Sequence, residues 1–342
     1  MSKVLVTGAA GFIGGYIVQE LINNGHEVVG LDNLSKYGEN SISQANGKRY
    51  KFHKGDAQNP EILYELLDDV EHLIAGAALI GGISYFHSFA YDLLATNERI
   101  IASTCDAAIK KFREKGNKLK KVTYLSSSMV YESTNVWPSK EGEELEIPPP
   151  KSSYGFQKLA VEYFAKAAWD QYGLPYTILR PFNCVGIGEY RAKSDLQIMS
   201  GDISLAMSHV VPDLIQKIYK NQKPVRILGD GNQIRCYTYG ADLAKGIVKS
   251  LDNPNALNND FNLSTREATS VKELAEKIWL KMKGLEKFEM ISEKSFKNDV
   301  SRRIPDCTKA EKQLGFKAET SLDEMLDIVI PWVTKAADEG LI

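Results

Sequence analysis

The residues best suited to chemistry are a tyrosine and a lysine four positions apart, Tyr154 and Lys158, in a segment with helical periodicity. Side chains at this spacing lie on one face of a helix. A free tyrosine titrates near pH 10 and is a poor base at neutral pH, but a nearby ammonium group favours the phenolate. The pair therefore predicts a base at Tyr154 whose pKa is lowered by Lys158.

A serine-rich segment adds a third group to this predicted site. The apolar run 121–125 predicts a buried strand, and Ser126, Ser127 and Ser128 follow it directly. The phenolate would take a proton from a sugar hydroxyl while hydride leaves the same carbon for a nicotinamide ring, with Ser127 hydrogen-bonded to that oxygen. Lys158 would also hold the nicotinamide ribose. Because Tyr-x-x-x-Lys alone is usually an ordinary helix face, the assignment depends on the rest of the chain.

The N-terminus provides that context. Val4–Val6 predicts a buried strand, Gly8, Gly11 and Gly14 follow at three-residue intervals, and apolar residues recur with helical spacing from Phe12 onward. A strand, a glycine turn and a helix let the backbone approach a dinucleotide and direct helix N–H groups at its pyrophosphate. The spacing is G-x-x-G-x-x-G, which differs from the standard G-x-G-x-x-G fingerprint.

Two acidic residues end the next predicted strands. Asp32 follows the strand predicted over 26–31, where a carboxylate accepts hydrogen bonds from ribose hydroxyls and repels a 2′-phosphate. This favours NAD over NADP. Asp56 follows the strand predicted over 50–54 and is equally suited to accept from an adenine amino group or to cap a helix beginning near Pro60.

The remaining pattern predicts an α/β fold. Strands predicted over 70–75, 121–125 and 175–181 alternate with helices, which is typical of a doubly wound parallel Rossmann sheet with helices on both faces. After residue 182 the pattern is irregular, which predicts a smaller mixed α/β substrate domain over the C-terminal edge of the sheet. We expect the NAD-binding domain over 1–182, with 234–263 returning to it, and the substrate-binding domain over 183–233 and 264–342.

Composition excludes several classes of partner. The chain of 342 residues has a formal net charge of −2, which gives no reason to expect nucleic acid or an anionic membrane as partner. No apolar run approaches a membrane span, and no signal peptide is visible. The four cysteines are scattered, which argues against a metal site and a disulfide framework. We therefore expect no metal and a cytoplasmic location.

The chain resembles the extended short-chain dehydrogenase/reductase family, in the branch that modifies nucleotide sugars. Motifs occur in family order over nearly the whole chain, at 7–14, 32–33, 55–56, 126–131, 154–158, 180–183, 229–239 and 302–306. The resemblance implies resident NAD held by Gly8, Gly11, Phe12, Ile13, Gly14, Asp32, Asn33, Asp56, Ala57, Ala77, Ala78, Asn97, Ser126, Tyr154, Lys158 and Pro181.

The resemblance also implies a nucleotide-sugar site and a homodimer. Arg235 and one of Arg302 and Arg303 would pair with the diphosphate as planar bidentate donors, although without the resemblance they would be read as solvated surface residues. Family members typically dimerise through two long helices per subunit, here the helix after Tyr91 and the helix containing Tyr154, in a four-helix interface. The implied substrate contacts are Gly82, Ser128, Asn183 (diphosphate or sugar), Val211 (nucleotide base), Arg235, Arg302 and Arg303.

The residue before Val130 separates the branches of the family. In the dehydratases and decarboxylases of the family this residue is a glutamate, and in the 3,5-epimerase branch it is a cysteine. Here it is Met129, whose thioether has no proton to give and is a poor base. C4 epimerisation needs only oxidation at C4, rotation of the keto sugar and return of the hydride. The resemblance therefore implies a C4 epimerase acting on a UDP-hexose such as UDP-glucose or UDP-galactose.

Two alternatives stay open. Gly81 and Gly82 resemble the glycine pair of the 3,5-epimerase branch, and the insertion over 190–205 fits neither pattern. A GDP- or dTDP-sugar oxidoreductase or 3,5-branch epimerase is therefore the second enzyme hypothesis. A non-catalytic NAD- or sugar-sensing regulator is the alternative from a different class, and the intact Ser127, Tyr154 and Lys158 argue against it.

Overall fold

A computed structural model describes residues 1–38, 49–80, 90–190, 198–200, 203–205, 209–295 and 299–342. Its centre is a seven-stranded sheet in the order β13-β6-β5-β4-β1-β2-β3, in which every neighbouring pair is parallel. This confirms the predicted doubly wound α/β sheet. Its strands are β1 (Lys3–Thr7), β2 (Glu27–Asp32), β3 (Tyr50–Lys54), β4 (His72–Ala75), β5 (Lys121–Leu125), β6 (Tyr176–Pro181) and β13 (Asn259–Leu263).

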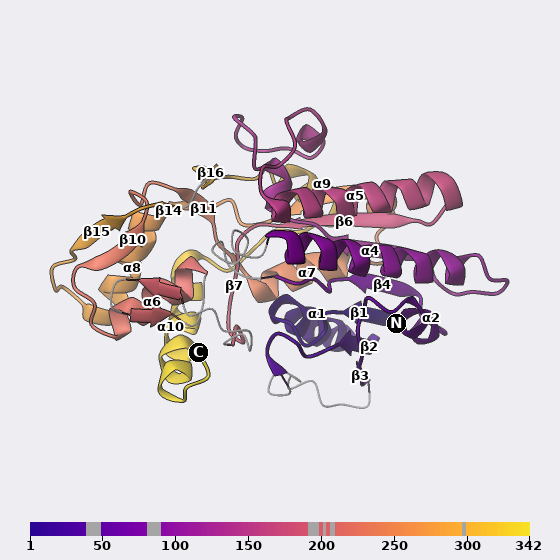
Figure 1. Ribbon diagram of the computed structural model, residues 1–342, viewed down its shortest axis with the longest axis horizontal. Coiled ribbons are helices and arrows are strands. Elements are labelled where there is room, and N and C mark those ends of the chain that lie inside the picture. The colour runs from indigo at the N-terminus through magenta and orange to yellow at the C-terminus, as the bar shows by residue number, and fades with distance from the viewer. Residues whose placement is uncertain (39–48, 81–89, 191–197, 201–202, 206–208, 296–298) are drawn as a thin grey trace.

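Helices cover both faces of the sheet (Figure 1). Val4 and Val6 of β1 point into one apolar cluster and Leu5 into the other, because side chains alternate along a strand. A strand buried on both faces is apolar throughout, which is why these segments read as continuous hydrophobic runs. One face is covered by α1 (Phe12–Asn23), α7 (Gly240–Ser250) and α9 (Thr308–Leu314), and the other by α2 (Pro60–Leu66), α4 (Ala90–Phe112) and α5 (Ser153–Tyr172).

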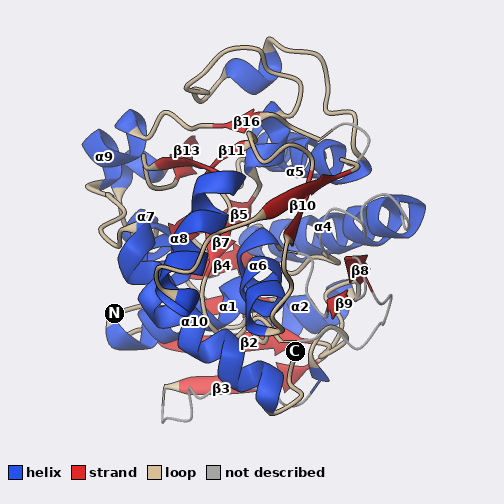
Figure 2. Cartoon of the chain, turned by 90° about the vertical axis from the view of Figure 1, so that its left-hand side faces the viewer, coloured by secondary structure: helices blue, strands red, loops and turns tan. Residues whose placement is uncertain are grey.

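A second unit has its own core at the C-terminal edge of the sheet. Figure 2 shows α6, α8 and α10 in front of the central strands. Capping boxes at Ser270 and Ser321 fix where α8 and α10 begin. The unit contains α6 (Val210–Tyr219), α8 (Val271–Lys283), α10 (Leu322–Asp338) and the parallel pair β10 (Val225–Leu228) and β15 (Met290–Glu293).

The remaining elements are short. A three-stranded sheet has the order β14 (Ala268–Ser270), β11 (Ile234–Cys236), β16 (Arg302–Arg303). The two-stranded pairs are β7 (Cys184–Val185) with β12 (Thr238–Tyr239) and β8 (Ile198–Ser200) with β9 (Ile203–Leu205). Single turns of 3₁₀-helix lie at η2 (Ser128–Tyr131), η3 (Glu143–Leu145) and η4 (Pro254–Ala256).

The chain returns to the first unit twice. β13 pairs with β6, and α7 packs against α1, whereas β11 lies in the connecting sheet. The segment around α9 differs from the prediction: we expected it in the second domain, but Ala310, Leu314 and Phe316 are buried with α1 and α7 in the first. In the described part of the chain, no helix is long and apolar enough to cross a membrane.

Candidate active site

The glycine turn after β1 is shaped for close backbone approach. Gly8 has a φ of +74°, and a Cβ there would lie 2.9 Å from the Ala77 backbone. A Cβ on Gly14 would lie 2.0 Å from the Gly8 carbonyl oxygen, so α1 reaches β1 only because residue 14 has no side chain. Gly11 precedes α1 without a side-chain cap, which leaves the N–H groups at Phe12 and Ile13 suited to a pyrophosphate.

Asp32 is fixed beside this turn. Its Oδ2 accepts from the Ala10 N–H at 3.1 Å and its Oδ1 from the Leu34 N–H at 2.8 Å. Burial raises the pKa of the Asp32 carboxyl, and these two backbone hydrogen bonds oppose the rise. The carboxyl group is therefore fixed at the end of β2, and its contact with a ribose remains a prediction.

Asp56 does not cap α2. The Asn59 side chain accepts from the first N–H groups of that helix, so the capping interpretation of Asp56 is wrong. Instead Asp56 accepts from the Gln58 N–H at 2.8 Å and from the Asn33 amide at 3.3 Å. The adenine contact remains a prediction for Asp56, with Asn33 adjacent to it and Ala57 buried behind it.

The edge beyond β4 is held by two polar side chains. Thr7 Oγ1 accepts from the N–H groups of Gly76 and Ala77, both at 3.1 Å. The Asn97 amide accepts from the Leu79 N–H at 2.7 Å and donates to its carbonyl at 2.9 Å. Asn97 thus holds the segment containing Ala77 and Ala78. Sequence reasoning missed this role of Thr7, whose signal is a hydroxyl residue at the end of β1.

Tyr154 is placed by the start of α5. Ser152 caps the helix by accepting from the Gly155 N–H at 3.0 Å, and Glu132 Oε2 accepts from the Ser152 N–H and hydroxyl at 3.0 and 2.8 Å. Any Cβ on Gly155 would lie 2.9 Å from the Met129 carbonyl oxygen. These contacts bring the first turn of α5 against η2. Glu132 is a second residue whose positioning role the sequence did not indicate.

The three predicted catalytic groups lie together at the C-terminal end of β5. Tyr154 and Ser127 are hydrogen-bonded, and both are buried. Lys158 Nζ lies 5.8 Å from the centre of the Tyr154 ring and donates to the Leu125 carbonyl oxygen at 3.0 Å. A phenol, a hydroxyl and an amine in this arrangement can exchange a proton with a substrate hydroxyl.

The charges around Tyr154 differ from the prediction. Burial raises the pKa of Tyr154, while the hydrogen bond from Ser127 and the positive charge of Arg303 oppose the rise. Burial also lowers the pKa of Lys158 to about 8. The expectation of a lowered Tyr154 pKa is therefore wrong for the protein's own charges. Lys158, whose Nζ is directed at the Leu125 carbonyl oxygen, is not among the groups that oppose the rise.

Ser126 has a different partner from the one predicted. Its buried hydroxyl donates to Glu162 Oε1 at 2.6 Å, within the helix face that also carries Lys158. The hydroxyl is therefore committed to a carboxylate of α5 and is not directed at a cofactor. Pro181, the remaining predicted cofactor contact, ends β6 and is half-buried.

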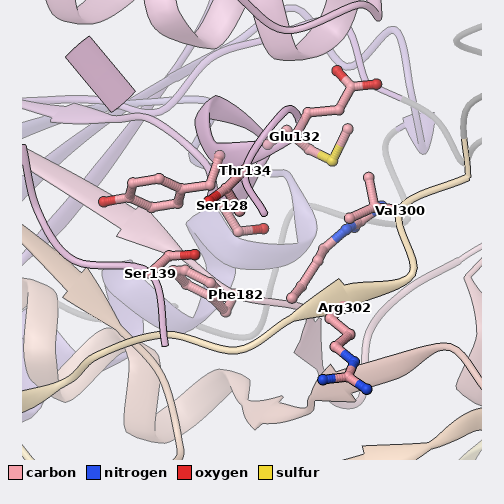
Figure 3. Close-up of a pocket in the computed structure, with 10 residues that line it drawn as sticks. Ser128, Glu132, Thr134, Ser139, Phe182, Val300 and Arg302 are labelled. Carbon is pink, nitrogen blue, oxygen red and sulfur yellow. The ribbon is translucent and has the colours of Figure 1, made fainter. Parts of the chain in front are cut away.

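A narrow pocket lies between η2 and the segment around β16 (Figure 3). Ser128 and Met129 line it from η2, and Met129 is buried against Tyr154 and Leu93. No side chain with a transferable proton occupies position 129. The other lining residues are Tyr131, Glu132, Thr134, Ser139, Phe182, Val300, Arg302 and Arg303.

Two arginines lie together on the three-stranded sheet. Arg235 and Arg303 are register partners on β11 and β16, and Asp299 lies 3.2 Å from the Arg235 guanidinium. The buried Nε of Arg303 has no hydrogen-bond partner among the described residues. Burial and the charge of Arg235 lower the pKa of Arg303 to about 9. Adjacent guanidinium groups with an unsatisfied donor suit an anion such as a diphosphate.

The structure separates Arg303 from its neighbour Arg302. Arg302 also lines the pocket, but it is exposed, its guanidinium lies 5.5 Å from the centre of the Trp137 ring, and it lies apart from the other labelled side chains in Figure 3. Val211 is 0% exposed in the core of the second unit, so its predicted contact with the base is wrong in this arrangement. Asn183 donates to the Cys236 carbonyl oxygen at 3.2 Å. Gly82 lies outside the described residues.

Tyr16 links the cofactor helix to the substrate side. Its hydroxyl accepts from the Ile187 N–H at 2.8 Å, and its ring packs against Tyr239. Cβ atoms on Gly186 and Gly240 would lie 2.3 and 2.5 Å from this side chain. Sequence reasoning missed Tyr16, for which the only signal is the pair of glycines that make room for it.

Comparisons with known proteins agree with this geometry. Residues 4–264 match the model of the NAD dependent epimerase/dehydratase family. A putative UDP-glucose 4-epimerase of Methanocaldococcus jannaschii is 33% identical, with 96% of this chain and 98% of that protein covered. The UDP-glucose 4-epimerase of Thermotoga maritima with UDP-glucose has a TM-score of 0.79 at 26% identity, covering 98% and 99% of the chains.

A further solved structure is the UDP-glucuronic acid 4-epimerase of Bacillus cereus with UDP-glucuronic acid and NAD, with a TM-score of 0.81 at 26% identity and 97% and 99% of the chains covered. The family match covers most of the chain, and the glycine turn and Asp32 fit the cofactor that the family uses. This protein therefore belongs to the NAD-dependent epimerase/dehydratase family and uses NAD as its cofactor.

Proposed function

We propose that the protein is an NAD-dependent C4 epimerase of a UDP-hexose, interconverting UDP-glucose and UDP-galactose. The observation that carries the proposal is Met129, which packs on Tyr154 where an elimination or a 3,5-epimerisation requires an acid or a thiol. Ser127, Tyr154 and Lys158 suffice for removal and return of one hydroxyl proton. The reaction needs no further proton-transfer group.

Each step has a residue to perform it. Tyr154 takes the proton of the C4 hydroxyl, Ser127 hydrogen-bonds the same oxygen, and Arg235 and Arg303 hold the diphosphate while the keto sugar turns over. When bound, NAD would supply a reversible hydride acceptor for C4, and the positive charge of its ring would favour the Tyr154 phenolate. Lys158 would hold the nicotinamide ribose.

The relatives agree on the reaction but differ in the sugar. Similar proteins are named as 4-epimerases of UDP-glucose, of UDP-glucuronic acid and of UDP-N-acetylglucosamine. All three names share the UDP group and position C4. We therefore treat UDP as the nucleotide and glucose/galactose as the first pair to test.

The test is a panel of UDP-, GDP-, dTDP- and CDP-sugars incubated with purified protein and NAD, with products identified by mass spectrometry and NMR. Interconversion of UDP-glucose and UDP-galactose without net redox change is expected. Turnover of only GDP- or dTDP-sugars would replace the proposal by the second enzyme hypothesis. No product from any sugar would leave the regulator as the better explanation.

We also propose a homodimer formed by α4 and α5. The described surface of α5 exposes Phe156 (47%) and Tyr163 (58%), and Tyr91 at the start of α4 is 77% exposed. Aromatic side chains spaced along one surface are typical of an interface. Light scattering should give twice the chain mass of 38.1 kDa. Tyr163→Asp should shift the protein to monomer, and a monomeric wild type would contradict the proposal.

We further propose that the enzyme is located in the cytoplasm, a reducing compartment in which free thiols persist. The cysteines at 105, 184, 236 and 307 are all free. Fractionation of source cells with an antibody to the chain tests this location, and recovery in an extracytoplasmic fraction would refute it.

A further inference from the structure

Three side chains on one face of α5 hold three consecutive residues at the end of β5. Tyr154 is hydrogen-bonded to Ser127, Lys158 Nζ donates to the Leu125 carbonyl oxygen at 3.0 Å, and Glu162 Oε1 accepts from the Ser126 hydroxyl at 2.6 Å. The helix residues are spaced by four, so they line one stripe of α5. The first two belong to the catalytic site, whereas the third, Glu162, has no part in the chemistry proposed above.

Glu162 is held rigidly from its other side. The fully buried Arg180 of β6 donates from Nε to Glu162 Oε1 at 2.8 Å and from Nη2 to Glu162 Oε2 at 2.6 Å. Arg180 Nη1 donates in turn to Asp260 of β13 at 2.7 Å and to the Tyr131 hydroxyl at 3.1 Å. A bidentate arginine leaves the carboxylate one geometry only. Glu162 is therefore fixed to the sheet independently of the catalytic residues.

We propose that Glu162 is a positioning residue for catalysis. Through Ser126 it fixes the end of β5 against α5, so that the next residue, Ser127, meets Tyr154 in the arrangement that proton transfer requires. Ser126 is the intermediary, because its hydroxyl points into α5 while that of Ser127 faces the substrate side. The inference rests on the proposed function, since it concerns the same Ser127 and Tyr154.

Ser126→Ala is the direct test. It deletes the hydroxyl but leaves both Arg180 hydrogen bonds to Glu162, so no buried charge loses its partner. We expect kcat for the UDP-sugar to fall about tenfold, because small displacements of reacting groups are costly. KM and NAD content should stay within about twofold of wild type. Ser250→Ala is the matched control, because that serine is also buried and donates one hydrogen bond, to Ile247 at 2.7 Å.

Glu162→Gln extends the test to the proposed residue. If Glu162 acts through Ser126, the double variant Ser126→Ala/Glu162→Gln should have the kcat of Glu162→Gln alone. Additive losses in kcat would overturn the proposal. Should Glu162→Gln fail to fold because Arg180 loses one of its buried carboxylate partners, Ser126→Ala still decides the question.

A readout without turnover separates this inference from the proposed function. The carbon-13 resonance of the Tyr154 ring Cζ, assigned with Tyr154→Phe, reports its hydrogen bonding. It should move in Ser126→Ala and stay in place in Ser250→Ala, whether or not any UDP-sugar is converted. An unmoved resonance, a kcat equal to that of Ser250→Ala, or a loss of NAD in Ser126→Ala would each overturn the inference. The last result would make Ser126 a direct cofactor contact.

Discussion

The catalytic side and the diphosphate side of the site are built in opposite ways. At the end of β5, the side chains of Ser126, Tyr154 and Lys158 are each paired within the protein. On the other side, Arg235 and Arg303 are register partners, and the Asp299 carboxylate lies 3.2 Å from the Arg235 guanidinium. The Nε of Arg303 is unpaired among the described residues. The first side is preorganised for proton transfer, whereas the second, in our proposal, is completed electrostatically by the anionic diphosphate.

This difference suggests that substrate binding and proton transfer are carried out by different parts of the site. The catalytic side keeps its geometry whichever sugar is present, because its side chains are hydrogen-bonded within the protein. Variants of these residues should therefore change kcat. If the other side binds the diphosphate, as we propose, its variants should change KM. The predictions below test this division, beginning with the largest expected effect.

Removing the Tyr154 hydroxyl should break the catalytic side alone. Tyr154→Phe is expected to lower kcat by about 10³-fold, in the range of general acid–base catalysis, while NAD content stays unchanged. Turnover is followed by NMR of the sugar nucleotides and NAD by its release on denaturation. Tyr172→Phe, at the far end of α5, is the control. Near-normal turnover of Tyr154→Phe would remove Tyr154 from the mechanism.

The start of α1 should reject a methyl group at Gly14 and tolerate one at the next residue, Gly15. Gly14→Ala places Cβ 2.0 Å from the Gly8 carbonyl oxygen, whereas a Cβ on Gly15 meets nothing within 4 Å. We expect Gly14→Ala to lower the free energy of unfolding by about 3 kcal/mol and to reduce NAD retention. Gly15→Ala should raise the free energy of unfolding by about 0.5 kcal/mol. Urea unfolding of both variants measures the contrast, and equal stabilities would disprove the packing argument.

On the diphosphate side, neighbouring arginines should behave differently. Arg303→Ala is expected to raise KM about 100-fold with a smaller change in kcat, because a buried charged donor is lost. Arg302→Ala should change KM by no more than about twofold, since that side chain is exposed on Trp137. Initial-rate kinetics over a range of substrate concentrations give both constants. A larger effect at Arg302 would reverse the assignment made from the pocket.

Lys158 should also show its burial in the pH dependence of stability. Its pKa is lowered from 10.5 to about 8, so between these values the unfolded chain binds more protons and stability rises with pH. The stability advantage of Lys158→Met over wild type should therefore shrink by about 2 kcal/mol between pH 7 and pH 9.5.

The matched control for this effect is Lys121, whose pKa burial also lowers to about 8. Lys121→Met should give a similar pH dependence in urea unfolding but retain turnover, because Lys121 lies at the opposite end of β5 from the site. A pH-independent difference for Lys158→Met would show that the ammonium group is not desolvated.

Local patterns predicted the catalytic side well, and tertiary packing decided the rest. The glycine turn, β1 and the Tyr154–Lys158 spacing are encoded within a few residues, so the sequence alone located them. The pKa of Tyr154 depends on burial and on the positive charge of the distant Arg303, and no local pattern contains either. Helical periodicity marked Val211 as an apolar position but does not distinguish a residue facing the core from one facing a ligand.

The same limit explains the choice between neighbouring arginines and the placement of α9. Arg302 and Arg303 point to opposite sides because they are consecutive in a strand, and only the pairing with β11 shows which one joins Arg235. Apolar spacing identifies α9 as a buried helix. However, α9 packs into the core around α1, from which it is separated by nearly the whole length of the sequence.

The place of β13 bears on how this enzyme can be divided. A fragment ending at residue 182 would contain the glycine turn, Ser127 and Tyr154, but β6 would be an open edge without its neighbour Asn259–Leu263. An unpaired apolar edge recruits strands from other chains, and Arg180 would also lose Asp260. The NAD-binding half is therefore not a transplantable module, and a soluble miniature of it would require grafting β13 back beside β6.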